Sequence, residues 1–437
     1  MKFRALALGL ILALPHTALA QSADPATREL IEKLLARIDS LEKRVAELEK
    51  TPPAARAALP TTAAPAAQSP PAAGHMAHDQ APTPQVEVPE ATQPVYPSLK
   101  IAGFGDLDYS ATNLHGPSGG FGAQTLLAAH SGFEEGQFVL HLSSALSQKV
   151  TVFSELSLTA RSDAGTGTPP APGFNPEVER IILRYDFNDY FKLSAGRYHT
   201  PINYWNTEFH HGQWLQTTIS RPEMIQFGGS FLPVHFLGTL AEGAVPAGGL
   251  NLNYNFGLGN GRGQVISRAG DFSDINNARA WLANVLVQPD KLFGLRVGGS
   301  VYRDELNPAA GPAAREWIQS AHIIWTKETP EFLAEFANVT HSFLNGGTSH
   351  SQAFYLQTAY RLPWFNKAWK PYYRFEQIHV PLSDLIFHPL VPTFSGSTVG
   401  LRYDFTTFAA FKLEYRNYMR RGLATVDGIF SQTSFTF

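Results

Sequence analysis

The stretch GIFSQTSFTF, residues 428–437, alternates apolar and polar side chains with the period of a β-strand. One face carries Ile429, Thr433, Phe435 and Phe437, and the other carries Phe430, Gln432, Ser434 and Thr436. A strand of a water-soluble sheet seldom leaves an apolar outer face beside an unpaired edge. We therefore expect this strand to pair on both sides and to turn its apolar face away from water.

From residue 98 onward, the chain divides into strand-like segments of about the length that a tilted strand needs to cross a bilayer, roughly 9–11 residues. Many of them alternate as the last one does. The sixteen segments are 98–110, 134–147, 149–160, 177–187, 190–199, 233–244, 248–258, 277–288, 292–304, 314–326, 330–342, 350–362, 368–380, 396–405, 408–420 and 427–437.

The connections between these segments distinguish a membrane barrel from a soluble sandwich, whose strands also alternate. After the even-numbered segments the chain turns tightly, as in QK, FND, VPAG, QPDK, KETP and TT. After the odd-numbered segments most links are longer and rich in Gly, Asn and Ser. Short turns on one side and long loops on the other are typical of outer-membrane barrels, and an even strand count places both barrel ends in the periplasm.

The sequence thus predicts an all-β protein, with residues 98–437 forming a 16-stranded antiparallel transmembrane β-barrel. Closure of the last strand on the first would leave no edge unpaired in lipid. Aromatic residues near strand ends match the girdles that flank the apolar band of such barrels. They are Tyr109, Phe187, Phe191, Trp325, Trp364, Phe405 and Phe437.

The residues before the barrel predict export and a periplasmic extension. Residues 1–20 have the basic start, apolar run and Ala-Leu-Ala end of a signal peptide. Residues 51–95 are rich in Pro and Ala and predict an extended, disordered linker. The chain has no cysteine, which excludes disulfides and thiolate metal sites, and its net charge of -3 gives no sign of a nucleic-acid partner.

Residues 25–50 predict a short coiled coil in the periplasm. An a/d seam is formed by Ile31, Leu34, Ile38, Leu41, Val45 and Leu48. β-Branched residues at a with Leu at d favour two strands. However, RIDSLE (37–42) and RVAELE (44–49) both resemble the Arg-h-x-x-h-Glu pattern of trimeric coils. We favour a trimer, while a single solvated helix remains the alternative.

The architecture of 98–437 resembles the large trimeric bacterial porins, in which a final strand ending in Phe is the sorting and assembly signature; Phe437 matches it. The coil and linker before the barrel resemble sugar-specific porins and some dicarboxylate or phosphate porins. The stretch GRYHTPINYW, 196–205, is most similar to phosphate-selective porins. The resemblance implies a homotrimer that contacts outer-membrane lipids and is inserted by the barrel-assembly machinery.

The longest link, residues 200–232, follows the fifth segment and is the third long loop. In trimeric porins the third long loop folds into the lumen and sets the narrowest point of the pore. On that resemblance, five charged or titratable residues are expected to face the solute, although the loop could instead cap the barrel or lie at a subunit interface. They are Glu208, His210, His211, Arg221 and Glu223. The two histidines would gain charge as the pH falls through about 6.5.

Alternation places a second set of charges on the inward face of the wall. The cations of this set are Arg180, Arg184, Arg374, Arg402, Lys412 and Arg416. Carboxylates at Glu155, Asp186, Glu376 and Glu414 share the face, and about half of these charges are expected to pair with one another. From residue 96 onward, 25 Lys and Arg stand against 27 Asp and Glu, which favours a general or weakly anion-preferring pore over a lysine-lined phosphate pore.

Three functions follow from these patterns. Passive diffusion of small hydrophilic solutes through a porin is favoured. A structural tether that binds peptidoglycan through the coil is the first alternative and is compatible with transport. A barrel enzyme is the least favoured, because the sequence holds no serine-centred motif such as G-x-S-x-G. No cofactor or metal is expected.

Overall fold

The computed structural model describes residues 96–114, 131–160, 174–209, 212–226 and 230–437. The predicted signal peptide (1–20), coiled coil (25–50) and linker (51–95) lie outside the described residues, so these three predictions stay predictions.

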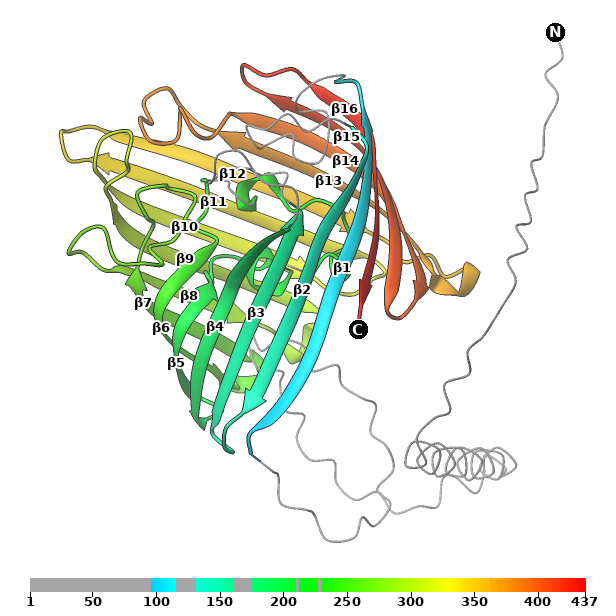
Figure 1. Ribbon diagram of the computed structural model, residues 1–437, viewed down its shortest axis with the longest axis horizontal. Coiled ribbons are helices and arrows are strands. Elements are labelled where there is room, and N and C mark those ends of the chain that lie inside the picture. Colours follow the sequence, from blue (N-terminus) through cyan, green and yellow to red (C-terminus); the bar gives the residue numbers. More distant parts are fainter. Residues whose placement is uncertain (1–95, 115–130, 161–173, 210–211, 227–229) are drawn as a thin grey trace, which may run out of the picture. The chain divides into compact units, whose positions relative to one another are not determined.

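The described residues form sixteen strands that close into one antiparallel barrel, in which each strand pairs with its sequence neighbours and β1 pairs with β16 (Figure 1). The predicted 16-stranded all-β barrel is therefore confirmed. The strands are β1 (Ser98–Thr112), β2 (Phe133–Ala145), β3 (Val150–Ala160), β4 (Phe174–Asn188), β5 (Phe191–His199), β6 (His235–Val245), β7 (Leu252–Asn260), β8 (Ala280–Val287), β9 (Leu295–Leu306), β10 (Ala314–Trp325), β11 (Glu331–Phe343), β12 (Thr348–Ala359), β13 (Trp369–His379), β14 (Phe394–Thr406), β15 (Ala409–Arg420) and β16 (Val426–Thr436).

The closing seam joins Phe437 to Gly103 of β1. The Phe437 N–H donates to the Gly103 carbonyl at 3.1 Å, and the Gly103 N–H donates back to the Phe437 carbonyl at 3.0 Å. The Phe437 ring lies over Gly103, where an added Cβ would stand 2.4 Å from the ring, and it stacks on Phe138 with centroids 5.8 Å apart. Glycine at 103 is thus what lets the last side chain lie flat on the first strand.

Strand β15 shows how the barrel sorts its side chains. Leu413, Tyr415 and Met419 are exposed on the outer face, whereas Lys412 and Glu414 point inward and are buried. This inversion of a soluble fold, with apolar groups outside and charges inside, follows the period-2 alternation of the strand. The faces predicted for this strand are confirmed.

Several predicted boundaries were wrong by three or four residues, and the largest difference is at the start of β7. The sequence places a strand at 248–258, but β7 begins at Leu252 because the chain first makes a tight turn. Gly248 and Gly249 have φ values of 67° and 85°, and Asn251 has a φ of 47°, all in the left-handed region. Glycine and asparagine tolerate this region, so the turn extends further than alternation indicates.

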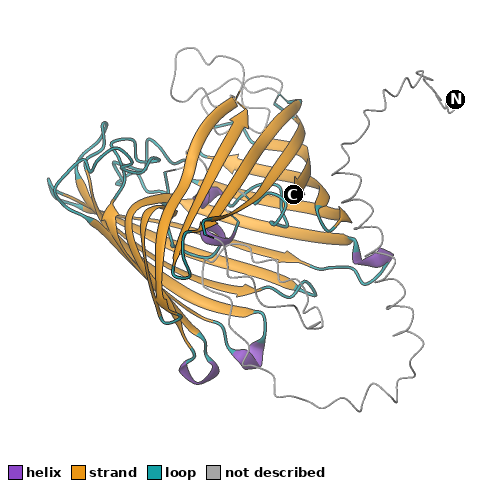
Figure 2. Ribbon diagram, turned by 60° about the horizontal axis from the view of Figure 1, so that its bottom comes forward, coloured by secondary structure: helices purple, strands orange, loops and turns teal. Residues whose placement is uncertain are grey.

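The links that follow the even-numbered strands gather at one end of the barrel, and most links at the other end are longer, although 344–347 and 421–425 are short (Figure 1). The links after the even-numbered strands are 146–149, 189–190, 246–251, 288–294, 326–330, 360–368 and 407–408. Among the described residues, no helix is both long and apolar enough to cross a bilayer. The longest described link joins β5 to β6 and carries two short helices, α2 (Trp205–Glu208) and η2 (Glu223–Ile225), within the ring of strands (Figure 2).

Candidate functional site

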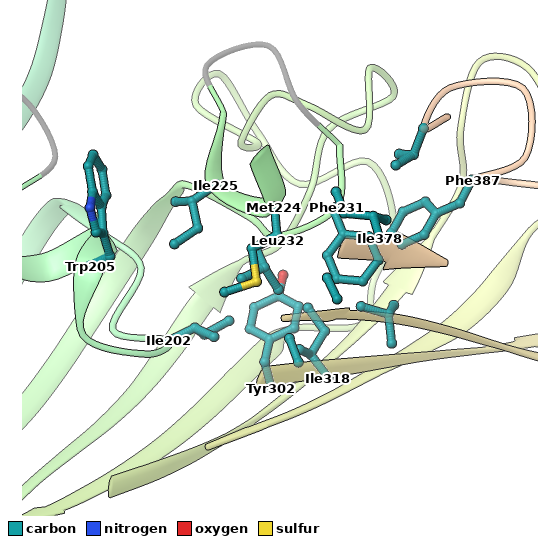
Figure 3. Close-up of a cluster of buried hydrophobic side chains, with 14 of the residues drawn as sticks. Ile202, Trp205, Met224, Ile225, Phe231, Leu232, Tyr302, Ile318, Ile378 and Phe387 are labelled. Carbon is teal, nitrogen blue, oxygen red and sulfur yellow. The ribbon is translucent and has the colours of Figure 1, made fainter. Parts of the chain in front are cut away.

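The described residues of the link between β5 and β6, 200–209, 212–226 and 230–234, lie inside the barrel and are called the inner loop here. Its apolar side chains pack against inward-facing side chains of the wall and form a buried cluster within the barrel (Figure 3). The loop contributes Ile202, Trp205, Met224, Ile225, Phe231 and Leu232, and the wall contributes Tyr302, Ile318 and Ile378. The wall therefore presents inward-facing apolar side chains where these residues of the loop pack on it.

Three cations of β13, β14 and β15 bind backbone carbonyls of the inner loop. Arg374 donates to the Ser220 carbonyl at 2.7 Å, and Arg402 donates to the carbonyl of Trp214 at 2.7 Å. The Lys412 ammonium donates to the carbonyls of Gln213 and Thr218. Arg374 and Lys412 are 0% exposed, so these cations face the loop and not water.

Three carboxylates of the wall bind backbone N–H groups of the same loop. Glu335 accepts from Trp205 at 2.7 Å. Glu376 and Glu414 accept from the N–H groups of Glu223 and Ile219, both at 2.6 Å. A buried irregular segment has few backbone partners of its own, so side chains of the wall must satisfy its donors and acceptors. The six residues Glu335, Arg374, Glu376, Arg402, Lys412 and Glu414 are called the latch.

Two carboxylates of the inner loop that were predicted to face the solute, Glu208 and Glu223, instead pair with arginines of the wall. Glu208 pairs with Arg296 at 3.0 Å, and Glu223 pairs with Arg420 through both of its oxygens. Both carboxylates are thus neutralised by the wall. His210 and His211 lie outside the described residues.

Arg221 of the inner loop is buried rather than free in the lumen. Its guanidinium lies 5.3 Å from the centroid of the Trp205 ring and donates to the Ile225 carbonyl at 3.2 Å. Burial lowers the pKa of Arg221 to about 9, and the negative charge of Glu179 opposes that shift. The group remains a cation at neutral pH, since even the lowered value is well above 7.

All six predicted wall cations lie on the inward face; five of them form ion pairs, and Lys412 is held by hydrogen bonds alone among the described residues. Arg180 donates to Glu155 at 2.5 Å, and Arg184 lies 2.8 Å from Asp186 and 3.5 Å from Glu242. The remaining pairs are Arg374–Glu376 at 3.1 Å, Arg402–Asp404 at 2.7 Å and Arg416–Glu414 at 2.8 Å, while Lys412 also donates to Gln432 at 3.0 Å. Three of the six, Arg374, Arg402 and Lys412, bind the inner loop, whereas Arg180 and Arg184 lie beside open space.

That open space is a cavity of about 400 Å³ between the start of the inner loop and the wall from β1 to β7. Its lining mixes apolar side chains, among them Val152, Ile182 and Leu240, with hydroxyls, an amide and paired charges. The lining includes Lys100, Ser143, Thr151, Phe153, Arg180, Arg184, Ser194, Tyr198, His199, Pro201, Thr207, Glu242 and Asn255. The inner loop therefore packs on the wall from β9 to β15, and the cavity lies on the other side of the lumen, beside β1 to β7.

Sequence reasoning missed several residues of this lining. Lys100 precedes the clear alternation of β1, although its exposed neighbours Leu99 and Ile101 mark it as inward. Glu242 stands in a Gly- and Ala-rich strand that shows little polar pattern. Their contact with the cavity arises from the folding of the inner loop, which leaves no local signal in either strand.

A buried cluster stands at the edge of the cavity around Glu155. The Glu155 carboxylate contacts His141 at 2.8 Å, Arg180 at 2.5 Å and His199 at 3.3 Å. Such a carboxylate with several partners rigidifies the wall that faces the open space. Within the part of the chain that the structure describes, no group of three or more His, Asp or Glu side chains has an arrangement that could hold a metal ion.

Comparison with known proteins gives a likeness in structure but none in sequence. No family model matches the chain, and no curated protein matches it. Among solved structures, an anion-selective porin from Comamonas acidovorans has a TM-score of 0.53 at 10% identity, with 78% of this chain and 100% of that chain covered.

Two further solved structures are similar to the same extent. OmpF of Salmonella typhi, in complex with daunomycin, has a TM-score of 0.53 at 12% identity, with 78% of this chain and 97% of that chain covered. The trimer form of OmpT, an outer membrane protein of Vibrio cholerae, has a TM-score of 0.50 at 11% identity, with 78% and 99% covered. These structural neighbours are porins and not enzymes, and the chain has the 16-stranded barrel fold of outer-membrane porins.

Proposed function

We propose that this chain forms a water-filled channel in the bacterial outer membrane, through which small hydrophilic solutes diffuse passively. The observation that carries the proposal is the asymmetric lumen. The inner loop is bound to the latch on one side, and a cavity of about 400 Å³ with a mixed polar and apolar lining lies against the opposite wall. A loop bound in this way narrows a wide barrel without closing it.

The outer surface supports a membrane location. Side chains such as Leu183, Phe256 and Leu413 point outward and are exposed, as a lipid-facing band requires. Closure of β16 on β1 pairs the backbone groups that an open edge would leave unsatisfied in hydrocarbon. With the predicted signal peptide, these features favour assembly by the barrel-assembly machinery, for which Phe437 would be the signal, and a periplasmic N-terminal extension.

We further propose a homotrimer. The trimer form of OmpT supports this assignment, since that protein has a similar barrel. The two Arg-h-x-x-h-Glu copies in residues 25–50 favour the same stoichiometry. Binding of peptidoglycan by the coil remains a sequence-based prediction.

The open wall favours a weak preference for anions. Arg184 shares its charge with Asp186 and Glu242, so this group is close to neutral or slightly negative by itself. Lys100 is exposed at the start of β1 and adds a positive charge to the same cavity. The charges of Lys100, Arg184, Asp186 and Glu242 cancel in sum, so the preference is weak and the pore discriminates by its electric field, without a tight binding site.

Replacing Lys100 and Arg184 together by Gln is expected to shift the reversal potential in a salt gradient toward cations. A unit charge roughly 8 Å from a monovalent ion changes its energy by about 0.5 kcal/mol even in water, which corresponds to roughly twofold in permeability ratio. Planar-bilayer recordings of the purified protein would measure the shift.

The matched control is Arg315→Gln, because Arg315 is exposed on the outer face of β10 and should leave the reversal potential as it is. A double variant indistinguishable from the parent would contradict the assignment of the pore to this wall. Absence of any conductance from the correctly folded parent protein would contradict the channel itself.

A further inference from the structure

A second loop folds into the mouth of the barrel. Residues 380–393, between β13 and β14, are called the lid here. Val380, Ile386 and Phe387 of the lid are fully buried. The Phe387 ring lies 5.4 Å from the ring of Phe231 in the inner loop, and Figure 3 shows it at the edge of the apolar cluster. The lid therefore rests on the inner loop.

A buried chain of charges connects the lid to the wall. His341 of β11 lies between two carboxylates, with its Nδ1 2.8 Å from Asp384 of the lid and its Nε2 3.1 Å from Glu316 of β10. The other oxygen of Glu316 accepts from Arg262 at 2.9 Å. His341, Glu316 and Asp384 are each 0% exposed, so water does not screen these contacts.

The geometry requires a proton on both nitrogens of His341. A carboxylate accepts hydrogen bonds and donates none, so two carboxylates facing one imidazole are both satisfied only by the imidazolium. The Ser351 hydroxyl completes the Asp384 site and donates to its second oxygen at 2.7 Å. The charges thus alternate along this series: Asp384 is negative, His341 positive, Glu316 negative and Arg262 positive.

Arg262 extends this chain to two further loops. It donates to the carbonyls of Ser230 and Phe231, at the end of the inner loop, at 2.7 and 2.8 Å. It also donates to the Ile266 carbonyl in the link between β7 and β8 at 3.0 Å. One connected set of buried charges therefore fixes the lid, the inner loop and the third loop at the mouth.

We propose that residues 380–393 are a charge-locked lid over the inner loop, held down by the His341–Asp384 pair and released when that pair loses its charge. The inference rests on the proposed function, because a lid matters only over a conducting lumen. Removing one partner of a buried ion pair leaves the other charge buried and uncompensated, which favours the state in which water reaches it. That state is the raised lid.

The surroundings of Asp384 define how acid would act on the lid. Burial alone would raise the pKa of Asp384, but hydrogen bonds from His341, the Phe387 N–H and Ser351 together with the charge of His341 hold it below its usual range. Because the pKa of Asp384 is depressed in the closed state, its ionisation stabilises the closed lid at any pH above the ordinary carboxyl pKa, which is near 3.9. This stabilisation is lost as the pH falls through the depressed pKa. The other charged groups packed around His341 and Asp384 are Glu316, Arg262 and Asp304. Because pH 5 lies above the depressed pKa of Asp384, we expect the lid to stay closed at pH 5.

The test combines a charge-removing variant with a covalent clamp. His341→Gln should raise the mean conductance of the open channel and give roughly a hundredfold faster chymotrypsin cleavage after Phe387, since cleavage tracks the population of the open form. The control is His350→Gln, because His350 is exposed on the outer face of β12, where its ring hydrogen-bonds to the Thr340 hydroxyl.

The clamp uses Ser349 of β12 and Ser383 of the lid, whose hydroxyl oxygens are 3.0 Å apart. Cysteines at these two positions can form a disulfide without moving the backbone far, and the chain contains no other cysteine. In the triple variant, oxidation should return both conductance and cleavage to parent values, and reduction should restore the His341→Gln behaviour.

If His341→Gln does not fold, as judged by heat-modifiable migration on gels, Asp384→Asn replaces it, because Asp384 lies in the lid and not in the wall. If the folded His341→Gln or Asp384→Asn variant kept the conductance and the protease resistance of the parent, the lid proposal would be wrong. A rise in conductance that persists after oxidation of the clamp would also contradict it. The protease result does not depend on conduction, so a failure of the proposed channel remains distinguishable from a failure of the lid.

Discussion

Replacing residues 206–218 of the inner loop by a short Gly-Ser linker is expected to raise the single-channel conductance roughly twofold or more, since the narrowest cross-section limits the current. The deleted segment supplies the carbonyls of Trp214 and Gln216 that Arg402 binds. It also supplies the carbonyls of Gln213 and Thr218 that Lys412 binds. Planar-bilayer recordings and liposome swelling with sugars of increasing size would measure conductance and size limit.

The same deletion is expected to change selectivity in a direction that simple widening would not produce. Arg402 and Lys412 are buried beneath the inner loop in the intact protein and would face the lumen without it. Anion preference should therefore rise together with conductance. An unchanged conductance and size limit would mean that the loop does not restrict the pore, and the proposed constriction would be withdrawn.

Replacing Arg374 by Met is expected to destabilise the barrel by about 3–5 kcal/mol, the cost typical of leaving one member of a buried ion pair without its partner. Arg374 is fully buried and pairs with Glu376 at 3.1 Å. It also binds the hydroxyl of Thr218 at 3.0 Å and the hydroxyl of Ser220 at 2.6 Å. The Met side chain fills similar space but satisfies none of these acceptors.

Urea titration of the protein in lipid vesicles would measure the change in the free energy of unfolding. Arg315→Met is the matched control, since that exposed arginine should give a change within the range of ordinary surface substitutions, about 0.5 kcal/mol. Equal stabilities for the two variants would contradict the role of Arg374 in holding the inner loop.

The strands and their faces could be predicted because alternation is a local property. From Lys412 to Arg420 of β15, every second residue is charged or aromatic. The structure turns Lys412, Glu414 and Arg416 inward, as that period requires. The start of β7 was harder, since left-handed residues at Gly248 and Gly249 extend a turn into an apparently apolar run.

The environment of an inward charge could not be predicted in this way. Lys100 and Lys412 both point inward, yet one is exposed at the cavity and the other is fully buried by the inner loop. The difference depends on how residues 213–218 pack on distant strands. The pair His341 and Asp384 is separated by 43 residues and likewise leaves no local pattern.

The central claim is that water and solutes pass along the wall of β1 to β7 and not along the wall beneath the inner loop. Because the native chain has no cysteine, single cysteines can test this directly with a charged thiol reagent applied during bilayer recording. Thr151 of β3 lines the cavity, whereas Thr398 of β14 is fully buried beside the hydroxyl of Tyr418. We predict that Thr151→Cys reacts rapidly and reduces the current, while Thr398→Cys stays unmodified unless residues 206–218 are removed. Rapid modification and block at Thr398→Cys in the intact protein, with no reaction at Thr151→Cys, would contradict the account.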